Sequence, residues 1–155
     1  MDGTISTTAE HEVVITRVIE APRRLVFNAW TQPQHIARWW GPRGFTTIHC
    51  DMDIRKGGLY RFGMRSPQGT EHWKRGLFRE LIKPERIVFT FAWENADGSL
   101  GHELLTTVVF EEHGEKTKLT LRQSGFVSIE VRDSHMQGWT STLERFDEYL
   151  ATQRG

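Results

Sequence analysis

Clusters of turn-forming residues divide the middle of this chain into short segments, and their spacing constrains the fold more than any other feature. Gly, Pro, Asn and Asp favour turns because they preset or tolerate the backbone angles that turns need. The segments between them have the length and the β-branched and aromatic content of strands. Six strands in hairpin order predict a mostly antiparallel meander. The expected strands span residues 45–54, 59–64, 71–82, 86–93, 102–111 and 115–123.

The segments on either side of this meander complete the expected order of elements. VVITRVIE, residues 13–20, is rich in β-branched side chains and predicts a further strand. Pro22 and Pro33 each start a short helix, because proline suits the first helical position. A long helix is expected from about residue 131 to residue 152, since its apolar side chains recur at spacings of three and four. This apolar stripe consists of Met136, Trp139, Leu143, Phe146 and Leu150.

The length and the charge balance of the chain limit the number of domains and the kinds of partner that we expect. The chain has 155 residues, which suits one domain, expected over residues 13–153 after a loosely held polar lead-in over residues 1–12. Lys plus Arg and Asp plus Glu both number 20, so the charge balance favours neither nucleic acid nor an acidic membrane as a partner. A lone cysteine, Cys50, excludes a disulfide framework. With no signal peptide evident, we expect a cytoplasmic protein.

The stretch RWWGPRGF, residues 38–45, places two adjacent tryptophans beside a Gly-Pro turn. One interpretation is that Trp39 and Trp40 only fill the layer between the short helices and the sheet. The other is that at least one of them forms the lid of a cavity. Large aromatic side chains on both the sheet and the long helix favour a wedge of space between them.

The order of the segments resembles one known family over about residues 13–150. EAPRRLVFNAWTQPQHIARWWGPRGF, DMDIRKGGLYRF, PERIVFTFAW and GWTSTLERFDEYL are similar to the Aha1-like (activator of Hsp90 ATPase homologue) branch of the START/Bet v 1-like SRPBCC superfamily. The resemblance implies an α+β helix-grip fold. In that fold a curved antiparallel sheet wraps around a long C-terminal helix, and two short helices follow the first strand. Family members often have R-P-G-G where this chain has RKGG, residues 55–58.

The resemblance also implies a deep cavity between the sheet and the long helix. We therefore expect this protein to bind a small hydrophobic or aromatic molecule there, with no cofactor. Pockets of this kind are mostly apolar with few polar groups. The residues expected to line the cavity are Trp39, Trp40, Phe62, Trp73, Phe78, Phe89, Phe91, Trp93, Gln123, Trp139 and Leu143.

Two other functions stay open at the level of the sequence. The resemblance implies that a chaperone of the Hsp90 type is one partner to consider, with the protein acting as a monomer or homodimer. A cyclase or hydrolase would need a titratable residue inside the cavity. Glu80 is the candidate buried acid, and it is buried only if its face of the strand points inward. Gln123 is either a polar anchor for a ligand or an ordinary strand-end hydrogen-bonding group.

Local motifs for other chemistry are weak. Strand alternation places His49 and Asp51 on one face and Cys50 on the other, which argues against a Cys–His nucleophile. The seven histidines lack the spacing of a zinc site, so no metal is expected. Gly57-Gly58 joins two expected strands, which indicates a tight turn rather than a phosphate-binding loop. No catalytic residue is assigned from the sequence.

Overall fold

A seven-stranded antiparallel sheet forms the larger part of the fold in the computed structural model, which describes residues 12–154. The six expected strands are present in hairpin order, and most of their ends lie within two residues of the predicted ends. Apart from Glu12, the lead-in expected over residues 1–12 lies outside the described residues. The strands are β1 (Val13–Ile19), β2 (Thr46–Met52), β3 (Leu59–Arg65), β4 (Glu71–Ile82), β5 (Arg86–Trp93), β6 (Leu104–His113) and β7 (Lys116–Ser124).

The first strand lies beside the last one. The order across the sheet is β1-β7-β6-β5-β4-β3-β2, so every neighbouring pair except β1 and β7 is joined by a direct connection. Val13 pairs with Gln123 at one end of the β1–β7 ladder, and Ile19 pairs with Thr117 at the other. This long-range pairing places the first strand beside the last one.

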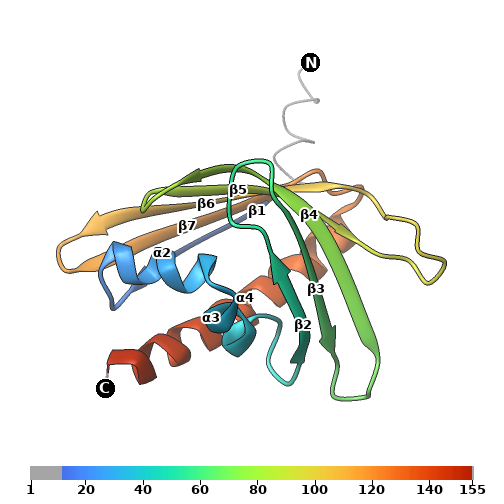
Figure 1. Ribbon diagram of the computed structural model, residues 1–155, viewed down its shortest axis with the longest axis horizontal. Helices are drawn as coiled ribbons and strands as arrows, with labels where there is room; N and C mark the ends of the chain where they lie inside the picture. Colours follow the sequence, from blue (N-terminus) through green and yellow to red (C-terminus); the bar gives the residue numbers. More distant parts are fainter. Residues whose placement is uncertain (1–11, 155) are drawn as a thin grey trace.

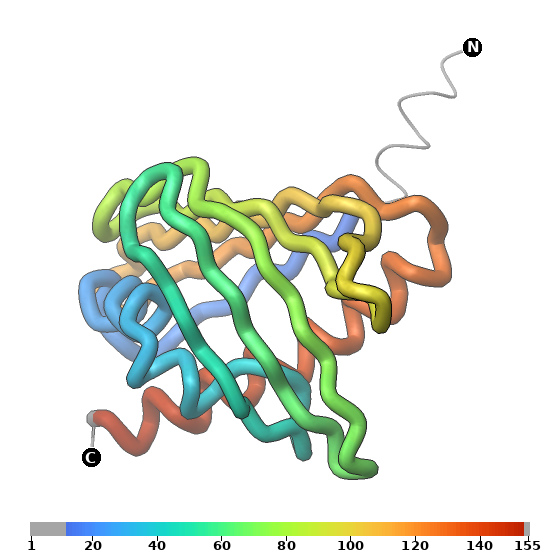
Figure 2. Tube along the Cα trace, turned by 45° about the vertical axis from the view of Figure 1, so that its right-hand side comes forward, coloured from blue at the N-terminus to red at the C-terminus, as the bar shows by residue number. Residues whose placement is uncertain are grey.

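Three helices lie on the concave side of the sheet (Figure 1). They are α2 (Arg23–Thr31), α3 (Pro33–Trp39) and α4 (Ile129–Arg154). Pro33 occupies the first turn of α3, as its fixed φ angle favours. Figure 2, a view turned by 45°, shows that the strands curve over α4. This arrangement is the helix-grip fold that the resemblance implied. None of the helices within residues 12–154 has the length and hydropathy needed to span a bilayer.

The core is aromatic and is centred on Trp30 of α2. Its ring centroid lies 4.8 Å from that of Trp39, 5.9 Å from that of Phe146 and 6.2 Å from that of Trp139. Tilted and edge-to-face contacts of this kind are favourable beyond the area that they bury. The stripe on α4 faces this cluster, because Leu143, Phe146 and Leu150 are each at most 1% exposed.

A β-bulge in β4 decides which side chains of that strand face the core. Phe78 pairs with Phe89 and Glu80 pairs with Val88, so Arg79 is the extra residue. Phe78 is buried before the bulge and Leu81 packs against the core after it, so the inward face changes parity between them. Of the two alternatives for Glu80, the buried one is therefore wrong, because Glu80 does not share the inward face of Phe78.

Glu80 instead lies at the surface. Its side chain is 44% exposed and its Oε1 lies 2.9 Å from Nε of Arg86. The sequence carries a local sign of the bulge, since the charged pair Arg79-Glu80 interrupts the apolar–polar alternation of FRELI.

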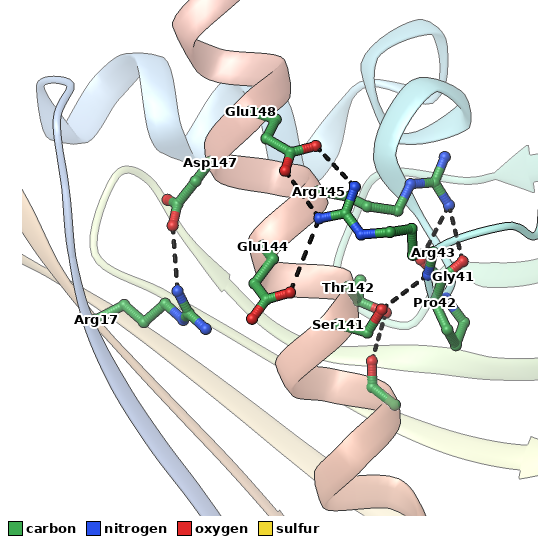
Figure 3. Close-up of polar contacts among 11 residues, drawn as sticks. Arg17, Gly41, Pro42, Arg43, Ser141, Thr142, Glu144, Arg145, Asp147 and Glu148 are labelled. Carbon is green, nitrogen blue, oxygen red and sulfur yellow. Dashed lines mark hydrogen bonds and ion pairs between the residues drawn. The ribbon is translucent and has the colours of Figure 1, made fainter.

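The RWWGPRGF loop is fastened to α4 by two arginines (Figure 3). Nη1 of Arg145 lies 3.0–3.3 Å from the carbonyl oxygens of Trp40, Gly41, Pro42 and Phe45. The guanidinium of Arg145 thus provides hydrogen-bond donors for carbonyl groups of a loop that lacks the regular backbone hydrogen bonds of a helix or sheet. The loop is held in a position that leaves Trp40 facing the interior.

Arg43 makes the second attachment, at the surface. Its backbone N–H donates to Oγ of Ser141 at 2.8 Å. Its guanidinium donates to both carboxylate oxygens of Glu148, at 3.1 and 2.8 Å. Both side chains are more than half exposed, so solvent screens this pair.

We expect Arg145→Met to destabilise the fold by about 2–3 kcal/mol, because the loop carbonyls lose charge-assisted hydrogen bonds. Urea unfolding measures this as a lower midpoint. Arg43→Met is the matched control, and we expect a much smaller shift because its partner is exposed. Equal shifts for the two variants would contradict this account of the loop.

Candidate functional site

An open-sided pocket of about 330 Å³ lies between the sheet and α4, beneath the RWWGPRGF loop. Its walls come from three parts of the chain that are far apart in sequence. The loop supplies Trp40, Gly41, Pro42 and Phe45; the sheet supplies Met64, His72, Lys74, Phe91 and Trp93; and α4 supplies Ser134, His135, Gly138, Trp139 and Thr142.

Four of the residues predicted to line a cavity belong to this pocket. Trp40, Phe91 and Trp93 form walls on the loop and on β5, and Trp139 faces them from α4. Trp40 and Trp139 meet edge to face, with ring centroids 5.3 Å apart. Because these large rings face each other across the pocket, side chains do not fill the space between them.

A second, smaller void lies deeper under the two short helices. Its volume is about 20 Å³, which is room for about one water molecule. Phe62, Phe78 and Phe89 line this void rather than the larger pocket, and Trp40 borders both. Tyr60 packs among these rings, with centroids 5.2–5.8 Å away, so this end of the wedge is almost filled.

Trp39 and Leu143 do not line the pocket, in contrast to the prediction. Both are fully buried in the core. Nε1 of Trp39 donates to the carbonyl oxygen of Ala29 at 3.1 Å, and its ring packs against Phe146 at 4.6 Å. The two adjacent tryptophans therefore divide the roles considered for them. Trp39 fills the helix layer, and Trp40 forms part of the pocket wall.

Trp73 lies on the outer face of the sheet, so its assignment to the cavity is wrong. Its ring covers Gly63 on the neighbouring strand, where an added Cβ would come within 2.7 Å of ring atoms. The guanidinium of Arg61 lies 4.2 Å from the ring centroid, and Nε1 donates to Glu71 at 3.1 Å. Alternation along β4 explains the error, because Lys74 takes the inward position.

Gln123 is fully buried next to the pocket and links several polar groups. Its Nε2 donates to Oγ1 of Thr106 at 2.8 Å. Its Oε1 accepts from Nε1 of Trp139 at 2.9 Å and from Nδ1 of His135 at 3.0 Å. The amide is thus committed to protein partners and holds two pocket residues in place. This arrangement corrects both earlier interpretations of Gln123, as a direct anchor and as a strand-end group.

The same network determines the state of His135. Nε2 of His135 accepts from Nε1 of Trp93 at 3.3 Å, while Nδ1 donates to Gln123. A second ring proton would face the N–H of Trp93, so the network suits the neutral imidazole. Burial, with a smaller contribution from the nearby charge of Lys74, lowers the pKa of His135 to about 4.

Lys74 is the charged one among the pocket residues that we did not predict. Its side chain is buried on the inward face of β4, at 3% exposure. Nζ lies 3.6 Å from the ring centroid of Trp40 and 4.5 Å from that of Phe91. Burial holds the pKa of Lys74 well below its usual value. The signal was present in the sequence, since Lys74 shares strand parity with Phe78.

The local triplet His49-Cys50-Asp51 alternates as expected. Cys50 packs against the core while His49 and Asp51 lie on the other face, so no Cys–His pair forms. Burial raises the pKa of the Cys50 thiol to about 11, which keeps it protonated and unreactive near neutral pH. Within residues 12–154 no cluster of His, Cys, Asp and Glu could hold a metal ion.

We expect Lys74→Met to raise the free energy of unfolding by roughly 1–3 kcal/mol at pH 7. The aromatic faces favour an ammonium by about 2 kcal/mol, but burying it costs several kcal/mol, so desolvation dominates. Urea unfolding measures the change, with the exposed Lys118→Met as control. A destabilised Lys74→Met protein would show that this balance is wrong.

His135 predicts a specific acid sensitivity. The unfolded chain binds a proton at His135 below pH of about 6.5, whereas the folded protein does so only below about 4. In this window the unfolded state holds more protons, so stability falls as the pH falls. We expect His135→Gln to lose less thermal stability than the unmodified protein between pH 6.5 and 4. His113→Gln, at the exposed end of β6, is the control, and parallel curves for all three proteins would refute the assignment.

Comparison with known proteins identifies a family with this architecture. The family model described as Activator of Hsp90 ATPase homolog 1-like protein matches residues 20–151. Among curated proteins, none matches the chain significantly in sequence.

Solved structures share the fold over nearly the whole chain. The AHSA1 protein from Silicibacter pomeroyi is 23% identical with a TM-score of 0.86, covering 92% of this chain and 99% of its own. A protein from Chromobacterium violaceum is 26% identical with a TM-score of 0.76, covering 89% and 95%. One from Arthrobacter aurescens is 21% identical with a TM-score of 0.82, covering 94% and 88%. Because the family model matches most of the chain, this protein belongs to the Activator of Hsp90 ATPase homolog 1-like family.

Proposed function

We propose that the protein binds a small hydrophobic or aromatic molecule in the pocket between the sheet and α4. The observation that carries this proposal is the pocket itself. Its volume of about 330 Å³ lies within the range of ligand pockets, about 300–1,000 Å³. Aromatic walls with a few polar groups are the usual lining of such sites.

Burial supplies the binding energy. Each square ångström of apolar ligand surface removed from water contributes about 25 cal/mol before association costs are subtracted. Trp93 and Trp139 are held by hydrogen bonds from their indole N–H groups, so these walls are already ordered. A pre-ordered wall lowers the entropy cost that the ligand must offset.

The alternative of a chaperone-interaction module has less support from the site. It would favour a solidly packed interior and a contiguous exposed apolar patch. The presence of the pocket means that the interior is not solidly packed. The chaperone partner and the choice between monomer and homodimer stay predictions.

The alternative of a cyclase or hydrolase is supported by two pocket residues with a displaced pKa, Lys74 and His135. Among the described residues, however, no carboxylate lines the pocket to act with either. The ring nitrogens of His135 are both engaged by neighbouring side chains. We therefore propose binding rather than catalysis.

Gly138 offers a direct test, because it lines the pocket without a side chain. An added Cβ there would have Pro42 Cγ as its nearest neighbour, at 3.9 Å, so the position has room. We expect Gly138→Phe to fill the pocket and to abolish thermal shifts caused by a panel of small aromatic compounds. Gly138→Ala, the matched control, should keep binding and stabilise α4 by about 1 kcal/mol.

Native mass spectrometry of the purified protein is the companion measurement. It should detect a retained apolar compound or a complex with panel members, and Gly138→Phe should lose it. An unmodified protein that stays empty and shows no thermal shift with any compound would refute the proposed function.

A further inference from the structure

The pocket contains one buried cation and no anion. Lys74 points into it from β4, and no Asp or Glu lines it among the described residues. Nζ of Lys74 makes no hydrogen bond or ion pair with any side chain or carbonyl group in residues 12–154. It lies over four aromatic rings, those of Trp40, Phe62, Phe91 and Trp93, with Nζ 3.6–5.8 Å from their centroids, and the Cys50 thiol and His135 are also near it.

Nearby carboxylates are turned away from Lys74. Glu71 lies on the same strand, but its oxygens accept from Trp73 and Arg65 and remain exposed. Glu94 lies just past the end of the neighbouring strand β5, where it accepts two hydrogen bonds from Arg61. These acids are paired outside the pocket with arginines and a tryptophan. The interior amine is left without a counter-charge.

Four ring faces are an unusual environment for an amine that has no other role. Their negative faces attract an ammonium, but the rings carry no net charge. A buried charge is normally paired with an opposite charge or a hydrogen-bond acceptor. Within residues 12–154 no carboxylate or carbonyl group takes that place at Nζ, and the pocket is the open route by which a ligand reaches it.

We infer that the ligand of this pocket is an amphipathic acid, with an apolar or aromatic body and a carboxylate that pairs with Lys74. This inference rests on the proposed function and names its ligand class. The apolar body packs against Phe91, Trp93 and Trp139, while the carboxylate accepts from Nζ. Ser134 and His72 also line the pocket and supply further potential donors.

Isothermal titration calorimetry at pH 7 with matched acids and amides tests this inference. The probes are phenylacetate with phenylacetamide, and 4-phenylbutyrate with 4-phenylbutanamide. Members of each pair share their apolar body and differ in charge. We expect at least one acid to bind the unmodified protein ten-fold or more tightly than its amide, because only the acid supplies the counter-charge.

Lys74→Met separates the amine from the rest of the pocket. We expect this variant to bind the acid no more tightly than the amide, while affinity for the amide stays within about two-fold of the original. Lys118→Met, which removes an exposed lysine, should keep the preference. Circular dichroism shows whether the variants are folded, and the acid–amide comparison in the unmodified protein needs no variant.

The outcomes separate this inference from the proposed function. Equal affinity for acid and amide in the unmodified protein overturns the inference and leaves apolar binding standing. A preference for the acid that survives in folded Lys74→Met overturns the role of Lys74. If neither member of either pair binds, the inference fails, and the compound panel on Gly138→Phe decides the proposed function separately.

Discussion

The packing of α4 across the concave face of the sheet is the contact on which the rest of the structure depends. The buried stripe of Leu143, Phe146 and Leu150 ties the helix to the aromatic cluster around Trp30. Further towards its N-terminus the same helix stands away from the strands, where Gly138 has no side chain. α4 is thus tightly packed at one end, and at the other it leaves the pocket between itself and the sheet.

Two buried polar side chains at the pocket, Gln123 and Lys74, differ in whether the protein supplies their hydrogen-bond partners. Gln123 is bonded through both its oxygen and its nitrogen to protein side chains, so it orients Trp139 and His135 and is unavailable to a ligand. Lys74 has aromatic ring faces against its Nζ and no carboxylate beside it among the pocket residues. The hydrogen bonds of Gln123 hold the pocket wall in place, whereas the amine of Lys74 can still accept a partner from a ligand. The contrast explains why the binding argument depends on Lys74.

Local patterns predicted most of the architecture and a part of the site. Strand alternation in KTKLTLRQ, residues 116–123, separates a charged face from a face with Thr117, Leu119 and Leu121, and these three are buried because β7 is regular. The same reasoning left two faces open for Glu80, and the bulge in β4 decides between them by changing the parity after Phe78. Trp73, in contrast, was misplaced. A large aromatic side chain was assumed to be interior, although a ring can also cover a glycine on an outer face.

The sequence by itself determined the elements, their order and the family. Periodicity and turn residues act over a few positions, so they can be read along the chain. Tertiary structure decided the pairing of β1 with β7, the division of roles between Trp39 and Trp40, and the isolation of Lys74. Each of these depends on distances between residues far apart in the chain. A count of charges that sums to zero could not show that one cation is buried among rings with its possible partners facing outward.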